Sequence, residues 1–185
     1  RQKKENSISN YFLRPGEDPY KKIKENLFLK VQVDKKTCYA GEPVLATFKL
    51  YSCLESKSDI VKNPGFYGFS VFDMINLSDK EVLAEKINGK IFDVHTIRKV
   101  QLFPLQAGVF TIDPMEIRNR VEFSSTAVSR KTEQEIVEGM FGNREEVKKN
   151  DVVNYETEIS TESIIINVAP IPAKNKPVDF SGAIG

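Results

Sequence analysis

The residue types that could carry out chemistry are few and scattered in this sequence. His95 is the only histidine, and a catalytic histidine needs a nucleophile or a carboxylate partner beside it. No companion motif accompanies His95, so we expect it to have a structural or surface role. One histidine without a Cys-x-x-Cys pair also gives no zinc-binding pattern. The sequence therefore predicts no catalytic residue, no metal site and no cofactor.

Two further pairs of side chains have reactive groups. Glu116 and Glu122 could serve as paired carboxylates, but no pattern in the sequence positions them, so an enzyme is the weakest functional interpretation. Cys38 and Cys53 lie near opposite ends of one predicted hairpin, whose strand of about ten residues runs ~33 Å. A disulfide needs Cα atoms about 4.4–6.8 Å apart. We therefore expect two free cysteines.

Four aromatic residues are crowded into one short stretch: Phe66, Tyr67, Phe69 and Phe72. Exposed, coplanar rings would make a platform for carbohydrate. Aromatic residues also favour strands and contribute large buried areas to a core. We expect a core role, and a carbohydrate-binding module is the alternative function.

The composition limits the class of protein. The chain has 185 residues with a net charge of +1, and 40% of them are hydrophobic. This size suits one domain with a proper core. The balanced charge gives no reason to expect nucleic acid or an anionic membrane as the main partner. The apolar runs are far shorter than the ~20 residues that span a bilayer. Because the first residue is Arg, we interpret the chain as a fragment of a longer protein.

The elements that must position these residues are mostly strands. Residues 101–114 predict two strands and a turn, since Pro104 stops the first strand and Gly108 gives the turn its backbone freedom. Alternation of apolar residues predicts strands at 27–33 and 44–53. A polar loop is expected at 54–65. Further strands are expected at 66–75, 82–87, 90–103, 115–123 and 164–168, with a hairpin turn at Asn88-Gly89. Phe92, Val94, Val100 and Leu102 are expected to share one face.

The predicted fold is an all-β, immunoglobulin-like β-sandwich of about seven to nine strands. Residues 1–26 are predicted to be an interdomain connector with a short helix from Pro19 to about Asn26, capped by Asp18. The sandwich itself is predicted to occupy residues 27–172, and residues 173–185 a linker into a following domain.

One long, partly helical insertion is expected at about 124–150. The sequence Thr132-Glu133-Gln134-Glu135 has the form of a capping box and predicts a helix over 133–141. Residues 151–162 contain four acidic residues and no basic one, and are expected to form an exposed strand or a hairpin arm.

Four stretches together resemble the BatD-type oxygen-tolerance proteins, which are found mainly in Bacteroidetes. They are Tyr39-Ala40-Gly41-Glu42-Pro43, Pro64-Gly65-Phe66-Tyr67-Gly68-Phe69, residues 102–108 through Ile112 and Pro114, and residues 170–172 through 176–185. The closing Asp-Phe-Ser-Gly-Ala-Ile-Gly run is the most specific.

This resemblance implies properties that the composition does not. Members of the family are membrane-anchored chains of immunoglobulin-like domains on the extracytoplasmic, or periplasmic, side of the inner membrane. They are associated with aerotolerance and are encoded beside proteins with von Willebrand factor type A domains. The resemblance therefore implies a non-catalytic protein-binding or scaffold module. Its contact would lie on the acidic 151–162 strand or on the insertion, and von Willebrand factor type A proteins would be its partners.

Overall fold

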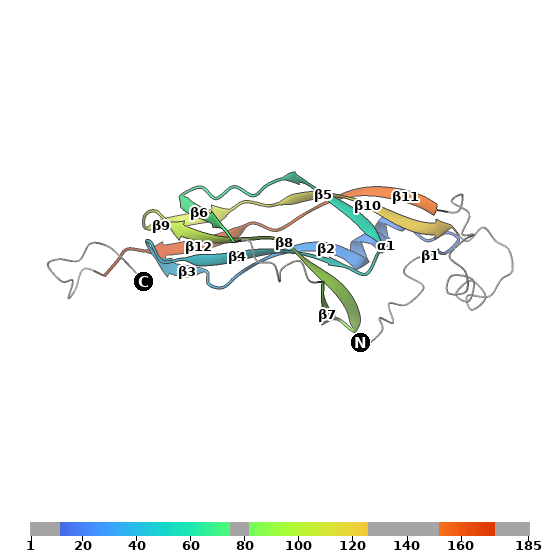
Figure 1. Ribbon diagram of the computed structural model, residues 1–185, viewed down its shortest axis with the longest axis horizontal. Helices are drawn as coiled ribbons and strands as arrows, with labels where there is room; N and C mark the ends of the chain where they lie inside the picture. The colour runs from blue at the N-terminus through green and yellow to red at the C-terminus, as the bar shows by residue number, and fades with distance from the viewer. Residues whose placement is uncertain (1–11, 75–81, 126–151, 173–185) are drawn as a thin grey trace.

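The structure of the chain, a computed structural model, describes residues 12–74, 82–125 and 152–172. Two layers of β-strands face each other across a hydrophobic core, and one short helix lies near one end (Figure 1). The predicted all-β, immunoglobulin-like sandwich is confirmed.

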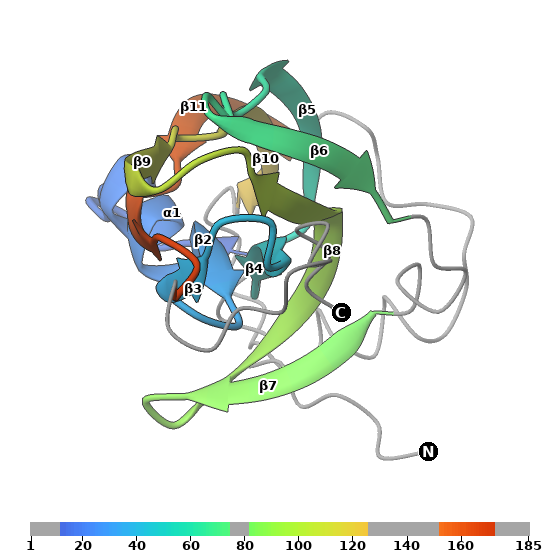
Figure 2. The same cartoon turned by 90° about the vertical axis from the view of Figure 1, so that its left-hand side faces the viewer.

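The first layer is a five-stranded antiparallel sheet. Its strands are β2 (Leu27–Val33), β4 (Val44–Ser52), β8 (Lys90–Pro104), β6 (Phe69–Asp73) and β7 (Leu83–Ile87). They are ordered β2-β4-β8-β6, and β7 pairs with the first part of β8. When the strands are lettered along the chain, the spatial order β2-β4-β8-β6 corresponds to the A-B-E-D sheet of an immunoglobulin domain. The β7–β8 hairpin extends away from the two layers (Figure 2).

The second layer consists of two sheets placed end to end. One contains β3 (Thr37–Tyr39), β12 (Ile164–Ala169) and β9 (Gly108–Ile112), and the other contains β1 (Phe12–Leu13), β5 (Ser56–Lys62), β10 (Glu116–Ser125) and β11 (Val152–Ser160). β9 continues into β10, and β11 continues into β12. At the junction, the backbone N–H of Met115 donates to Thr161 Oγ1 and that of Thr161 donates to the Met115 carbonyl, both at 3.0 Å.

The core follows from the alternation of apolar residues that the sequence contains. On β4, Val44, Ala46 and Phe48 are fully buried, because alternate side chains of a strand point to one face. The second layer contributes Ile112, Met115, Ile117, Val121, Phe123 and Ile166 to the same core. Burial of each large side chain contributes roughly 1.5–3 kcal/mol.

Several sequence predictions are confirmed by these elements. The strands at 27–33, 82–87 and 90–103 appear within a residue or so of the expected limits. Asn88 and Gly89 form the hairpin turn with φ values of 49° and 83°, as a type I′ turn requires. The two strands of residues 101–114 are β8 and β9. They lie in different layers, so the turn between them leads from one layer to the other.

The predicted loop at 54–65 is wrong, because it contains β5. β5 pairs antiparallel with β10, from Ser56 beside Val121 to Lys62 beside Glu116. All seven of its residues are polar or exposed, since its two apolar residues, Ile60 and Val61, are themselves exposed. An edge strand held mainly by backbone hydrogen bonds needs no apolar alternation, so the sequence lacked the pattern that predicts a strand.

The prediction of one shared face along β8 is also wrong. Phe48 of β4 lies opposite Arg98, but the next residue, Lys49, lies opposite Thr96. Ile97 is therefore an extra residue, a β-bulge, and the side chains before it face the opposite way from those after it. Val100 and Leu102 join the main core. Phe92 and Val94 instead form a second cluster with Tyr51 and Cys53.

The N-terminal part of the described chain packs on the sandwich. Helix α1 (Pro19–Asn26) confirms the predicted helix, and the Asp18 carboxylate accepts a hydrogen bond from the Tyr20 N–H at 2.9 Å. Ile23 is buried in the main core. β1 runs parallel to the end of β10. Residues 12–26, which we expected to belong to a connector, are thus part of the packed unit.

The predicted strands at 115–123 and 164–168 correspond to β10 and β12, and the exposed strand expected at 151–162 is β11. Residues 124–125 of the expected insertion belong to β10. The rest of the insertion, its predicted helix over 133–141 and the linker at 173–185 lie outside the described residues.

Candidate functional site

The structure does not bring the reactive side chains of the sequence together. His95 is exposed on β8, opposite Leu50. Glu116 and Glu122 are six residues apart on the same strand, which places them roughly 20 Å apart. The Glu116 carboxylate pairs with Lys62 Nζ at 3.0 Å. Cys38 and Cys53 are free and buried, which confirms the prediction of two free cysteines, and burial raises the pKa of both thiols.

The aromatic cluster is divided between core and surface. Phe69 is buried against Phe110, with ring centroids 5.5 Å apart, and Phe66 packs edge-on to Phe48. The other two rings are exposed: Tyr67 by 79% and Phe72 by 63%. The core expectation is therefore correct for two of the four residues. The four rings do not form one exposed platform.

The acidic strand β11 faces arginines on its neighbour β10. Glu158 accepts hydrogen bonds from Arg118, the shorter at 2.9 Å, and Glu156 accepts them from Arg120, the shorter at 2.8 Å. Arg120 lowers the pKa of the Glu156 carboxyl. On the other side of β10, Asp59 of β5 lies beside Arg118 and Lys57 lies beside Arg120. Each arginine is thus the centre of a row of three charged residues across the sheet.

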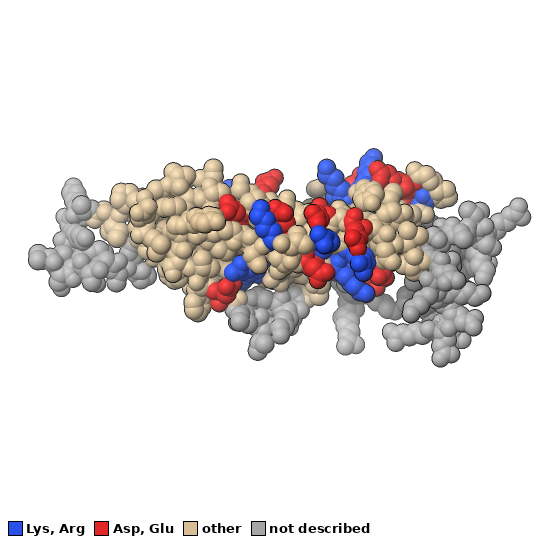
Figure 3. Space-filling model, turned by 90° about the horizontal axis from the view of Figure 1, so that it is seen from above, with Lys and Arg blue, Asp and Glu red and all other residues tan. Residues whose placement is uncertain are grey.

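We call the outer side of β5, β10 and β11 the charged face. Figure 3 shows acidic and basic side chains interspersed over this part of the molecule. The carboxylates predicted to bind a partner are, on the described strand β11, neutralised by the sheet itself.

In the other half of the second layer, the described strands present no charged side chain on their outer side. The outward residues of β3, β12 and β9 are Thr37, Tyr39, Val109, Thr111, Ile165 and Asn167. We call this surface the uncharged face. Val109 is 69% exposed and Ile165 55%. The end of the molecule that carries β9 shows almost no charged side chains in Figure 3.

Two exposed residues extend the uncharged face at the end of the sandwich. Leu105 and Tyr67 lie on adjacent loops, which are joined by a hydrogen bond of 3.0 Å from the Leu105 N–H to the Gly68 carbonyl. Gly68 has a φ of 86°, and a Cβ on it would come within 2.4 Å of the Phe110 ring. The close packing of Phe110 against this glycine fixes the two loops in place.

A groove of about 810 Å³ runs along the free edge of β2. One wall is formed by residues 28–33 of β2 and by Lys36, and the other by Ser160, Glu162, Ser163 and Ile164 at the β11–β12 junction. Among the strands that the structure describes, neither wall has a further strand paired to its edge. β2 is the last strand of its sheet and β11 of its own, and β3 pairs only with the residues of β12 from Asn167 onward.

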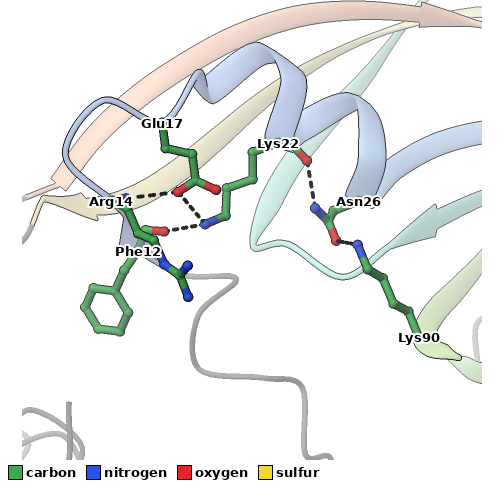
Figure 4. Close-up of polar contacts among 6 residues, drawn as sticks. All are labelled: Phe12, Arg14, Glu17, Lys22, Asn26 and Lys90. Atoms are coloured by element: carbon green, nitrogen blue, oxygen red, sulfur yellow. Dashed lines mark hydrogen bonds and ion pairs between the residues drawn. The ribbon is translucent and has the colours of Figure 1, made fainter.

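A buried polar cluster fastens the N-terminal segment to the sandwich, at the end away from the uncharged face (Figure 4). Lys22 is buried, and its Nζ donates to the Phe12 carbonyl and to Glu17 Oε2. The Asn26 side chain donates to the Lys22 carbonyl at 2.8 Å and accepts from Lys90 Nζ at 3.2 Å. The cluster therefore ties α1 both to β1 and to the β7–β8 hairpin. Its polar groups satisfy one another, which is typical of a structural contact.

Comparison of the chain with protein families, with curated proteins and with solved structures finds no match. The described residues contain no helix of the length and hydrophobicity that crossing a membrane requires. Within the same ranges, no group of three or more histidine, cysteine, aspartate or glutamate side chains is arranged to hold a metal ion.

The uncharged face and the groove depend on strand register and were missed by sequence reasoning. The one relevant signal in the sequence was that Val109 and Ile165 belong to apolar runs. Such a run does not show which of its side chains point outward. Groove walls that come from residues 28–36 and 160–164 lie too far apart in the sequence for any local pattern to join them.

Proposed function

We propose that this chain is a non-catalytic protein-binding module that docks a folded partner through the uncharged face. The observation that carries the proposal is the exposure of Val109 and Ile165 on a three-stranded surface whose other outward residues are Tyr39, two threonines and an asparagine. Exposed apolar surface rimmed by polar residues is a common mark of a protein–protein contact. The centre of such contacts is depleted in charged residues.

The charged face is a poorer candidate for the contact. A partner that bound there would have to separate Arg118 from Glu158 and Arg120 from Glu156, or match both members of each pair. Desolvation of charges that already have partners is costly. We therefore place the contact on the uncharged face and not on the acidic strand.

The resemblance to BatD-type oxygen-tolerance proteins supplies the biological context of this proposal. The module would belong to a membrane-anchored, periplasmic protein that supports oxygen tolerance. Its partners would be membrane proteins with von Willebrand factor type A domains. The four sequence stretches that resemble this family support the proposal.

Site-specific photo-cross-linking in the native host tests the proposed contact. A photoreactive residue replaces Thr111 on the uncharged face, and a matched one replaces Asp59 on the charged face. We expect a cross-link to a von Willebrand factor type A protein from position 111 only, and its loss in a Val109→Lys variant. Cross-links from position 59 alone, or a cross-link from position 111 that Val109→Lys leaves intact, would refute the proposal.

A carbohydrate-binding module is the second candidate, because Tyr67 and Phe72 are exposed. It predicts that a Tyr67→Ala, Phe72→Ala double variant loses affinity for cell-envelope polysaccharide in a pull-down assay. Equal retention of both proteins on the polysaccharide would rule out these two rings as the site.

A further inference from the structure

We propose that the groove along β2 binds an acidic, extended segment of a partner protein, which adds to the first layer as a further strand. This inference rests on the proposed protein-binding function and names a second contact, separate from the uncharged face. It is argued from the free edge of β2, from the shape of the groove and from the charges on its walls.

The free edge of β2 offers backbone groups to such a segment. β2 pairs with β4 along its whole length, from Leu27 beside Ser52 to Val33 beside Ala46, and with no other strand of the described residues. In an antiparallel pair, every second residue directs its N–H and C=O away from the partner strand. These groups form a template on which an extended chain can pair.

The groove has the length and lining that such a segment needs. Residues 28–33 of β2 line it continuously, which corresponds to about 20 Å of extended chain. Leu29, Val31 and Val33 lie on the core side of β2, and Ile164 approaches from the other wall. These side chains provide an apolar floor for alternate side chains of a bound strand. The opposite wall is itself a strand edge, so the bound chain would enter a gap between two layers.

The charges on the walls select an acidic segment. Lys30 and Lys36 lie on the β2 side and Glu162 on the other, so the lining has two positive charges and one negative. Lys36 and Glu162 have no ion-pair partner among residues 12–74, 82–125 and 152–172, in contrast to the paired charges of the charged face. Lys30 Nζ lies over the rings of Phe28 and Tyr51, at 5.1 Å and 5.6 Å from their centroids, so its charge is held on the face of β2 opposite the apolar floor, where the other alternate side chains of a bound strand would point.

Other regions of the described structure carry weaker inferences. The Lys22 cluster is internally satisfied, and the buried thiols of Cys38 and Cys53 contact no second reactive group. The free edge of β5 borders the charged face, of which β5 is a part. Within the part of the chain that the structure describes, the groove along β2 is the one place where free backbone edges, an apolar floor and unpaired charges coincide.

A synthetic peptide tests the inference on the purified chain. The probe is a fluorescent peptide of about nine residues, in which valine alternates with threonine or glutamate. A second peptide replaces each glutamate with lysine. A third has the sequence of the first but carries N-methyl groups on alternate amides, which remove strand pairing and leave the side chains unchanged. Binding is measured by fluorescence anisotropy.

We expect the acidic peptide to bind at least about 10-fold tighter than the lysine peptide and than the N-methylated peptide. Lys36→Glu should weaken its binding about 5-fold, the effect of an exposed charge pair. Lys57→Glu on the charged face is the matched control, because Lys57 is also exposed, lies beside Arg120 and has no ion-pair partner among the described residues. Binding by this control should stay within about 2-fold of the unmodified chain.

A variant that gains affinity distinguishes a real effect on binding from a failure to fold. Glu162→Lys should tighten binding of the acidic peptide, by up to about 5-fold, and an unfolded protein cannot do this. Val109→Lys, which tests the uncharged face, should leave peptide binding unchanged. The two proposals can therefore fail separately.

Four outcomes would overturn the inference. Three concern peptide binding: absence of acidic-peptide binding at about 1 mM peptide, equal binding of the N-methylated peptide, and a Lys57→Glu effect as large as that of Lys36→Glu. A dimer of the chain that the peptide dissociates would assign the groove to a second copy, which would also overturn it.

Discussion

At the scale of single residues, the described part of the core contains one side-chain polar group that lacks a hydrogen-bond partner. Asn119 is fully buried on the core side of β10, and its Oδ1 accepts a hydrogen bond of 2.6 Å from Ser58 Oγ. Its Nδ2 has no hydrogen-bond partner within the described structure. An unsatisfied buried donor costs about 1–3 kcal/mol, so Asn119 lowers the stability of the sheet in which it lies.

The bond between Ser58 and Asn119 can be tested with a double-mutant cycle. Ser58→Ala should reduce the free energy of unfolding by about 1–2 kcal/mol, because the Asn119 amide then lacks both partners. In an Asn119→Leu background the same change should cost much less, since no amide remains. Urea denaturation measures both values, with Ser56→Ala on the same strand as the control. Equal costs in the two backgrounds would show that the bond contributes nothing.

At the scale of elements, the sequence predicted strands where side chains alternate and failed where backbone geometry decides. The pattern of Val44, Ala46 and Phe48 is visible without a structure, and so are Asn88-Gly89 and the cap at Asp18. β5 has no such pattern. The charge rows on β10 and β11 depend on register, which a sequence does not specify before its strands are paired.

The β-bulge at Ile97 is the clearest case of an element that sequence reasoning could not find. It reverses the faces of β8, and so it creates the cluster around Tyr51. Burial, and to a smaller degree the Glu85 carboxylate, raise the pKa of Tyr51 to about 12. A tyrosine whose pKa is raised by folding stabilises the fold at pH values below about 10. That contribution is lost as the pH rises through the folded value.

Deletion of Ile97 should remove the bulge and turn Phe92 and Val94 toward the main core. Tyr51 would lose its cover, and its pKa should fall toward the ordinary value of about 10. A spectrophotometric titration of the folded protein measures this change, and a Tyr51→Phe variant identifies the signal. Ile97→Ala keeps the residue count and should keep the titration near 12. If the deletion variant also titrated near that value, the bulge would not be the cause of the second cluster.

At the scale of the whole molecule, charge is unevenly distributed along the sandwich. The charged face covers the half that contains β10 and β11. Its acidic and basic side chains are interspersed across the strands and largely cancel in charge. The uncharged face covers the half that contains β9 and β12. The groove along β2 has a surplus of positive charge. The two proposed contacts therefore differ in the physical forces that would hold them.

This difference predicts opposite responses to salt. Binding of a folded partner at the uncharged face should change by less than about 2-fold between roughly 0.05 M and 0.5 M NaCl, because salt screens only interactions between charges. Binding of the acidic peptide in the groove should weaken several-fold over the same range, since exposed pairs with Lys30 and Lys36 are screened. Anisotropy for the peptide and surface plasmon resonance for the cross-linked partner measure the two responses. If the partner's affinity fell with salt as steeply as the peptide's, charged residues would hold that contact, and the uncharged face could not be its centre.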